Sequence, residues 1–218
     1  MMDHAEIEEA AFGDAASTAK RRQIMDGARL VFLEQGFDAA SMGEIARRAG
    51  VSKGTLYVYF KSKEDLFETI FEEESRAQVE RIFSLDPEDH NVESVLTALG
   101  RAHIKYLCQP ERLCPLRTVL SIAVRMPEVG RRFYDAGPAT GIAGVRAYLE
   151  AQVAAGILQI EDSEIAAAQL IDAFQSTLFK PMMFANAAAP EDERIDHVVR
   201  IAVRTFLAAY AATPGRHG

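Results

Sequence analysis

Apolar residues recur along most of this chain at intervals of three and four, which is the spacing of an amphipathic helix. The first apolar stripe predicts a helix from Ala19 to Gly36 and consists of Ile24, Ala28, Val31 and Phe32. No segment shows the strict alternation of a half-buried strand, so the pattern predicts an all-α protein. Further helices are expected at 41–50, 52–60, 62–83, 92–108, 111–125, 128–155, 163–185 and 191–211.

Two short helices are predicted between residues 41 and 60, and each begins at a capping serine. Ser41 is followed three residues later by Glu44, the spacing of a capping box in which each side chain satisfies a backbone N–H. Gly50 can leave the first helix with a positive φ, and Ser52 caps the second helix. A helix, a glycine-containing turn and a second helix form the helix-turn-helix layout, whose second helix enters a DNA major groove.

The second helix of this pair has two different faces. Leu56 and Phe60 share an apolar face and are expected in the core, whereas Lys53 and Tyr57 share another face. This division predicts a helix that is held by its apolar side and presents its polar side to a partner.

The net charge of the 218-residue chain is −8, which by itself argues against nucleic acid as a partner. The charge is unevenly distributed: residues 1–19 carry −5, residues 20–63 carry +5 and residues 64–218 carry −8. The basic segment coincides with the helix-turn-helix pattern, as a phosphate-binding surface requires. The alternative is an ordinary solvated helical face that happens to be basic.

The composition limits the class of protein. Only two cysteines and no apolar signal segment indicate a reducing, cytoplasmic location, and no run reaches the roughly 20 apolar residues that span a membrane. The acidic residues 1–18 are expected to form a flexible arm.

The segment Gly50-Val51-Ser52-Lys53-Gly54-Thr55-Leu56-Tyr57, with Tyr59-Phe60-Lys61-Ser62-Lys63-Glu64, resembles the DNA-binding signature of the tetracycline-repressor (TetR) family. The stretch from Pro110 to Pro138 resembles the C-terminal domain of an AefR-like subgroup of that family. The resemblance implies an all-α homodimeric repressor with an N-terminal three-helix helix-turn-helix domain, followed by a larger helical ligand-binding and dimerisation domain. We expect an arm at 1–18, a DNA-binding domain at 19–67, an effector and dimerisation domain at 68–212, and a flexible tail at 213–218.

The resemblance also implies contact residues and a mechanism. Its partners would be double-stranded DNA with a roughly palindromic operator, a small apolar effector and a second copy of the chain. Effector binding would favour a state with badly spaced recognition helices, and the helix that begins at Ser62 would act as the lever. The positions that match family DNA contacts are Ser41, Ser52, Lys53, Gly54, Thr55, Tyr57, Tyr59 and Lys63.

Two residues of this chain depart from the family pattern, which affects how the family's DNA contacts are assigned to it. Gly43 stands where several family members carry a longer polar residue that reaches a base, so this protein is expected to read fewer bases from that helix. Tyr59 stands where histidine is common, which leaves the type of contact open.

For the larger domain, the residues expected to line the effector cavity are His103, Met126, Phe133, Tyr134, Phe174, Gln175, Phe179, Met182 and Met183. The alternative for each is that it simply fills the core. The last two helices are apolar on more than one face, which predicts burial on both sides. The expected dimer interface consists of Ile171, Phe174, Leu178, Val199, Val203 and Phe206.

Other functions have less support in the sequence. The histidines and cysteines lack metal-ligand spacing, no nucleophile–base arrangement is apparent, and no cofactor motif is complete, so neither a metal site, a cofactor nor an enzyme is expected. The glycines between 137 and 144 indicate close helix packing, and Gly137-Pro138 predicts a kinked or divided helix. Cys108 and Cys114 flank a proline-containing break, where buried structural cysteines are more common than a redox pair. The alternative function is a helical small-molecule or protein-binding module without specific DNA binding.

Overall fold

A computed structural model describes residues 4–212 of the chain, without the side chains of 4–16, 71–75, 110, 111 and 114. Between His4 and Ala212 the described backbone is helical and contains no strand, only an isolated bridge between Leu158 and Ala211, so the all-α prediction is confirmed. The chain forms two compact units, Met1–Glu73 and Glu74–Gly218. None of the described helices is long and apolar enough to cross a membrane.

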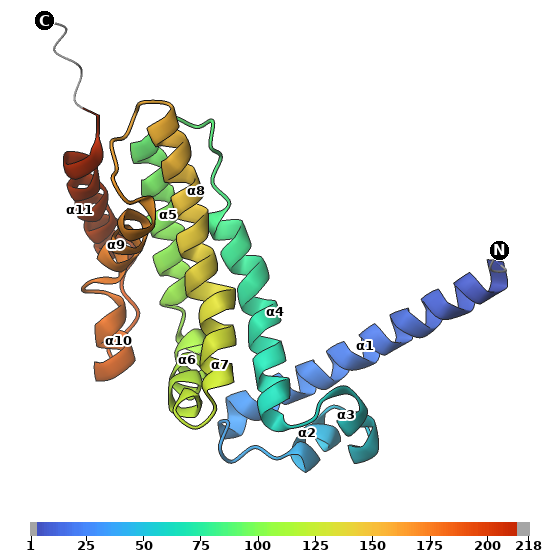
Figure 1. The fold of residues 1–218 in the computed structure, drawn as a ribbon. Helices are drawn as coiled ribbons and strands as arrows, with labels where there is room; N and C mark the ends of the chain where they lie inside the picture. Colours follow the sequence, from blue (N-terminus) through green and yellow to red (C-terminus); the bar gives the residue numbers. More distant parts are fainter. Residues whose placement is uncertain (1–3, 213–218) are drawn as a thin grey trace, which may run out of the picture. The chain divides into compact units, whose positions relative to one another are not determined.

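The first unit contains α1 (His4–Gln35), α2 (Met42–Arg48), α3 (Lys53–Tyr59) and the beginning of α4 (Lys63–Phe83), as Figure 1 shows. The rings of Phe32, Phe37 and Phe67 form a cluster with centroids 5.1–5.6 Å apart. The helices α1 and α2 approach closely at Gly27, where an added Cβ would lie 2.8 Å from the backbone of Ala49. The core of this unit is completed by Ile24, Ala28, Ile45, Leu56, Phe60 and Leu66.

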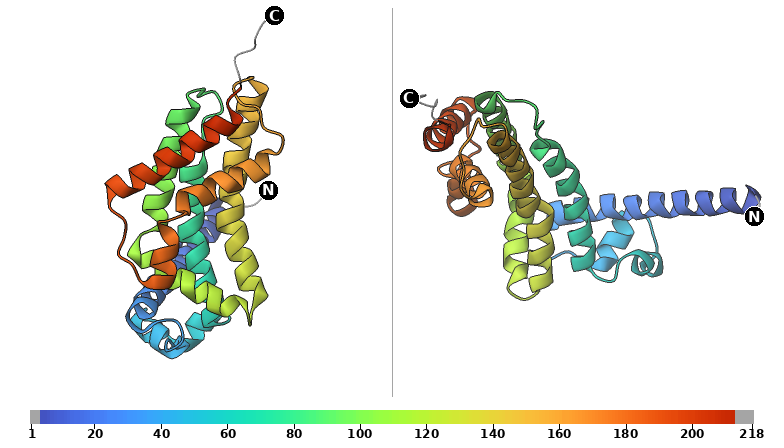
Figure 2. Two further views of the ribbon diagram at one scale, coloured as in Figure 1. Left: turned by 90° about the vertical axis from the view of Figure 1, so that its left-hand side faces the viewer. Right: turned by 45° about the horizontal axis from the view of Figure 1, so that its top comes forward.

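The second unit contains the rest of α4 and all later helices. They are α5 (Val92–Leu107), α6 (Pro110–Ala123), α7 (Pro127–Tyr134), the π-helical turn η1 (Asp135–Ala139), α8 (Thr140–Ala154), α9 (Ser163–Gln175), α10 (Phe179–Ala185) and α11 (Asp192–Tyr210). Helix α8 packs against α9, and α11 crosses α5 obliquely (Figure 2). At Gly100 of α5 an added Cβ would lie 2.8 Å from the side chains of both Phe174 and Val199, so α9 and α11 approach α5 closely.

The loop between α4 and α5 is fastened to α8 by side chains. The Tyr148 hydroxyl donates to the Asp89 carbonyl at 2.8 Å, and the Gln152 amide donates to the Pro87 carbonyl at 2.9 Å. At the end of α4, the ring of Phe83 lies on Gly141 of α8, and the backbone carbonyl and Cβ of Phe83 lie on Gly144. The prediction of close helix packing at these glycines is therefore confirmed.

Two helix boundaries differ from the sequence-based expectations. Helix α1 begins at His4 rather than at Ala19, because the Ala- and Glu-rich segment has high helix propensity. The predicted helix 163–185 is wrong: it is divided into α9 and α10, since Pro181 has no N–H and its ring would clash with the carbonyl of Thr177 in a continuous helix. The predicted irregularity at Gly137-Pro138 is confirmed as the π-helical turn η1. The predicted tail at 213–218 lies outside the described residues.

Candidate functional site

The N-termini of α2 and α3 are each fixed by a short-range hydrogen bond to a capping serine. The Ser41 hydroxyl accepts from the Glu44 N–H at 3.2 Å, and the Ser52 hydroxyl accepts from the Thr55 N–H at 3.0 Å. Gly50 adopts a φ of 65°, as the sequence predicts. The reciprocal half of the expected capping box is not formed, because the Glu44 carboxylate pairs with Arg47 one turn later.

Helix α3 is amphipathic in the predicted sense. Leu56 and Phe60 are buried, at 0% and 2% exposure, whereas Tyr57 is 52% exposed. Lys53 and Gly54 are also exposed, so the polar face of α3 is open to a partner. The structure brings the predicted contact residues of α3 together on one short helix, with the exposed Ser41 at the start of α2.

Thr55 and Tyr59 are less accessible than the other predicted contact residues of α3, since both are partly buried. The Thr55 hydroxyl lies 2.8 Å from the Ser52 hydroxyl, which ties Thr55 to the cap of its own helix. These two residues therefore have less freedom to reach a partner than Lys53 or Tyr57.

Lys63 has a role within the protein that the sequence analysis missed. Its ammonium donates to the backbone carbonyls of Phe37, Asp38 and Ala40 at 2.9, 3.1 and 3.1 Å. An ammonium has three N–H donors, so these bonds use all of them. Lys63 thus holds the loop between α1 and α2, which argues against its predicted contact with a DNA phosphate.

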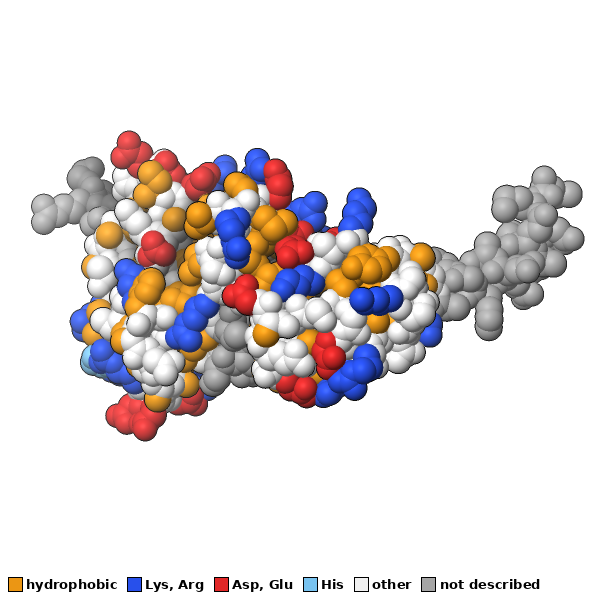
Figure 3. All heavy atoms as spheres, turned by 90° about the horizontal axis from the view of Figure 1, so that it is seen from below, with side chains coloured by type: hydrophobic (Ala, Val, Ile, Leu, Met, Phe, Trp, Pro, Cys, Tyr) orange, Lys and Arg blue, Asp and Glu red, His pale blue; other side chains and the backbone are white. Residues whose placement is uncertain are grey.

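The basic charge of this unit is only partly neutralised. Arg29, Arg47 and Arg48 pair with Asp26, Glu44 and Glu34, respectively, all at exposed positions where such pairs add little stability. In the space-filling view of Figure 3, Lys and Arg side chains are interspersed with acidic and hydrophobic ones. The net positive charge of residues 20–63 remains available for a polyanion.

In the second unit, a polar pair lies within the apolar core. His103 of α5 is 9% exposed, and its Nε2 lies 3.3 Å from Nε2 of Gln175 on α9. The ring of Phe83 meets the imidazole edge to face, with centroids 5.2 Å apart. Within the part of the chain that the structure describes, the buried Nδ1 has no hydrogen-bond partner. Burial lowers the pKa of His103 from 6.5 to about 4, so the ring is neutral at physiological pH.

The remaining residues expected at the effector cavity do not form one group. Phe174, Met182 and Met183 are buried in the hydrophobic core, and Phe179 and Phe133 are partly buried. Met126 and Tyr134 are 41% and 53% exposed, which places them on the surface of the α6–α7 region. Of the predicted set, the structure brings together His103, Gln175 and the adjacent Phe174.

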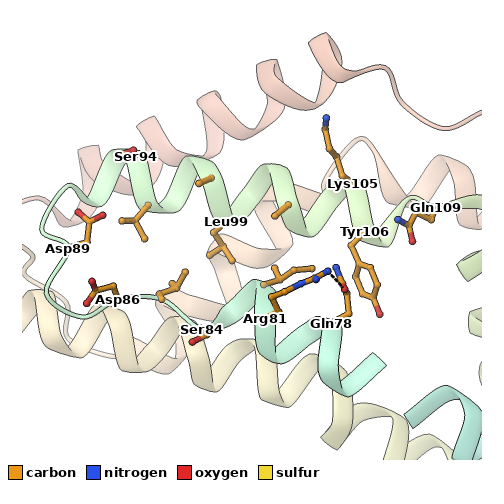
Figure 4. Close-up of a pocket in the computed structure, with 15 residues that line it drawn as sticks. Gln78, Arg81, Ser84, Asp86, Asp89, Ser94, Leu99, Lys105, Tyr106 and Gln109 are labelled. Carbon is orange, nitrogen blue, oxygen red and sulfur yellow. Dashed lines mark hydrogen bonds between the residues drawn. The ribbon is translucent and has the colours of Figure 1, made fainter. Parts of the chain in front are cut away.

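A hollow of about 600 Å³ lies between α4 and α5 and was not anticipated from the sequence (Figure 4). None of the predicted effector residues lines it. Leu99 and Val95 of α5 are among its lining residues. On the α4 side Arg81 is hydrogen-bonded to Gln78, and Asp86 and Asp89 lie at one end. Its lining residues alternate with core residues on the same helices, so the apolar stripe alone could not identify it.

A second hollow, of about 630 Å³, lies between α9 and α11. The six residues predicted for the dimer interface are buried within the chain, and of these only Phe206 lines the hollow. The rest of its lining comes from residues outside the predicted set, which include Gln169, Ala173, Ile201 and Thr205.

Of the two cysteines, the structure describes the side chain of Cys108 alone. Cys108 is buried, and burial raises the pKa of its thiol to about 11, so the reactive thiolate is scarce at neutral pH. The side chain of Cys114 lies outside the described residues.

A short helix with an open polar face, held by a buried stripe and preceded by a capped helix and a glycine turn, defines the class of helix-turn-helix DNA-binding proteins. The chain belongs to the TetR family of bacterial transcriptional regulators: residues 24–70 match the family model "Bacterial regulatory proteins, tetR family", and residues 94–212 match "AefR-like transcriptional repressor, C-terminal domain". The resemblance inferred from the sequence is thereby confirmed.

Solved structures and one curated relative agree with this assignment. A TetR-family regulator from Mesorhizobium loti superposes with a TM-score of 0.82 at 29% identity, over 89% of this chain and 98% of that one. The flavonoid-responsive regulator FrrA gives a TM-score of 0.74 at 29% identity, again over 89% and 98%. The fatty acid metabolism regulator protein of Bacillus subtilis is 41% identical over 63 residues, which is 29% of this chain and only 32% of that relative.

Proposed function

We propose that the protein is a homodimeric repressor that binds a roughly palindromic DNA operator through α3 and is released by a small, uncharged, largely apolar molecule bound in its second unit. It would act in the cytoplasm, with residues 19–67 binding DNA and residues 68–212 binding the effector and the partner chain. The observation that carries the proposal is the exposed Lys53–Tyr57 face of α3, fixed by the buried Leu56 and Phe60.

The polar face of α3 supports a division of contacts. Lys53 can donate to a guanine edge, whereas the hydroxyls of Tyr57, Ser41 and Ser52 suit phosphate oxygens, which set register without reading sequence. Gly54 allows close approach of the backbone. Thr55 and Tyr59 would contribute only at the edges of the contact, since both are partly buried.

The effector is proposed to bind beside His103 and Gln175. A buried nitrogen without a partner costs roughly 1–3 kcal/mol, and a ligand with one hydrogen-bonding group would recover part of that cost. The neutral imidazole and the apolar surroundings favour an uncharged ligand. The names of a flavonoid-responsive regulator and a fatty acid metabolism regulator among the similar proteins are consistent with a largely apolar effector.

The dimer is proposed to form through the outer faces of α9 and α11. Ile201 is 40% exposed on α11 and Ile165 is 54% exposed on α9, so both helices present an apolar side chain at the surface. Two-fold symmetry would present two copies of α3 to two operator half-sites, about one or more DNA turns apart.

The test of the DNA-binding proposal is titration of the DNA upstream of the protein's own gene, followed by fluorescence anisotropy at two salt concentrations. We expect specific, salt-sensitive binding to one short segment, and Tyr57→Ala should weaken it by about 10-fold or more. Phe184→Ala, which truncates an aromatic side chain that is 82% exposed on α10, is the matched control and should bind like the wild type. Binding that is weak, insensitive to salt and equal for all sequences would favour a helical module without specific DNA binding.

The effector site predicts a pH dependence of stability. The unfolded chain binds a proton at His103 below about pH 6.5, whereas the folded chain does so only near pH 4, so the free energy of unfolding should fall by about 3 kcal/mol across that window. His103→Leu should remove this part of the dependence in urea unfolding experiments at pH 7.5 and pH 4.5. Equal pH dependence in both proteins would contradict the neutral, buried state of His103.

A further inference from the structure

The side chain of Lys53 lies over Gly43, across the turn between α2 and α3. A Cβ added to Gly43 would lie 3.0 Å from Cε and 3.4 Å from Nζ of Lys53, and 3.9 Å from the Ser41 hydroxyl oxygen. The end of the Lys53 side chain therefore occupies the space that a side chain at position 43 would fill.

The backbone gives no reason for glycine at position 43. Gly43 lies inside α2 and is not among the glycines with positive φ, which are Gly36, Gly50 and Gly156. Glycine in the middle of a helix costs about 0.5–1 kcal/mol relative to alanine, and at Gly43, in the first turn of α2, the backbone gives no reason to prefer glycine. The only described group that an added methyl would crowd is the end of Lys53.

The ammonium of Lys53 is available for an external partner. Among the described residues it takes part in no ion pair and no hydrogen bond, in contrast to Lys63, whose donors are all used. Lys53 is also the first residue of α3, the end of a recognition helix that enters the groove and meets base edges.

We propose that Gly43 and Lys53 act as one specificity-determining pair, in which the missing side chain of Gly43 fixes where the Lys53 ammonium meets a guanine edge of the operator. The pair rests on the proposed entry of α3 into the major groove. Guanine presents two acceptors, N7 and O6, on its major-groove edge, and lysine is a common donor to them. Gly43 contributes no contact of its own and acts by leaving Lys53 in place.

If Gly43 acts through Lys53, a substitution at position 43 should change DNA recognition without lowering the stability of the protein. Cε and Nζ are the far end of a flexible side chain, so a methyl at position 43 moves Lys53 without disturbing the backbone. Gly43→Ala should therefore keep or raise the melting temperature and still change DNA recognition. A variant that is folded at least as well as the wild type but reads DNA differently would distinguish this role from a structural one.

The experiment is a double-mutant cycle on DNA that the wild type selects from a randomised pool of duplexes. Affinities of the wild type, Gly43→Ala, Lys53→Ala and the double variant are measured for the selected site and for each single-base-pair change in it. Lys53→Ala should lower the affinity for the selected site by about 10-fold or more and should abolish the preference for guanine at one position. Gly43→Ala should lower the affinity by about threefold or more, and its effect should fall on the same position. In the Lys53→Ala background, Gly43→Ala should have no further effect.

Gly137→Ala is the control for a glycine-to-alanine change in a helical segment, because beyond its chain neighbours the added Cβ would meet nothing within 4 Å. It should bind DNA like the wild type. A Gly43→Ala effect of equal size with and without Lys53 would overturn the pair. So would a uniform loss across all base changes, which would assign Lys53 to a phosphate. If the wild type selects no sequence at all, the proposed DNA-binding function fails, and the pair fails with it.

Discussion

Replacement of Ile201 by aspartate is expected to leave the protein monomeric and to lower its operator affinity by about 100-fold or more. Ile201 is 40% exposed on α11 and lines the hollow that α11 forms with α9. A carboxylate in the centre of an apolar interface would be desolvated without a partner, which opposes association. A monomer also loses the gain from binding two half-sites at once, which is of the order of 10²–10⁴.

Light scattering coupled to size-exclusion chromatography would measure the oligomeric state, and fluorescence anisotropy would measure operator affinity. Val124→Asp is the matched control, because it places the same charge at the C-cap of α6, where Val124 is 85% exposed. This control should remain a dimer with wild-type affinity. An Ile201→Asp protein that is still dimeric and fully active would exclude the α9–α11 surface as the interface.

A single methyl group at Gly144 is expected to destabilise the second unit by about 1–3 kcal/mol or more. The added Cβ would lie 2.5 Å from the carbonyl oxygen of Phe83 and 3.1 Å from its Cβ. The first of these atoms belongs to the backbone, so α8 and the end of α4 must separate to accommodate the methyl. The buried ring of Phe83 would move with them, away from Gly141 and His103.

Thermal unfolding followed by circular dichroism would measure the loss, with Gly137→Ala as the reference for a glycine that has open space. The reference variant should melt above Gly144→Ala, because its added methyl can meet only its chain neighbours, which include Pro138. Equal melting temperatures for Gly144→Ala and the wild type would show that the contact between α8 and Phe83 relaxes without cost.

The features that the sequence predicts best are those that depend on neighbouring residues. The caps at Ser41 and Ser52 and the positive φ of Gly50 follow from local hydrogen bonding and local sterics, and they form as expected. The burial of Leu56 and Phe60 follows from helical periodicity. The division between α9 and α10 also has a local cause, Pro181, but the apolar residues on both sides of it suggested a continuous helix.

The dimer and effector residues depend on information that periodicity does not contain. Helices α9 and α11 are apolar on more than one face, and the sequence cannot say which face the protomer itself buries. The more apolar face, with Val199 and Val203, packs in the core, while the sparser face with Ile201 reaches the surface. Lys63 is a similar case, since its partners on the loop before α2 lie more than twenty residues away in the chain.

The π-helical turn at Asp135–Ala139 has a consequence for how this chain tolerates changes in length. Buried positions step by four or three within a helix, but Ala136 is followed by the buried Gly141 five residues later. A π-helical turn contains one residue more than an α-helical turn, so it accommodates a one-residue insertion within a continuous helix. A relative that is one residue shorter between Val129 and Val145 can close this turn into regular α-helix. Single-residue gaps in an alignment of related proteins should therefore collect at this turn.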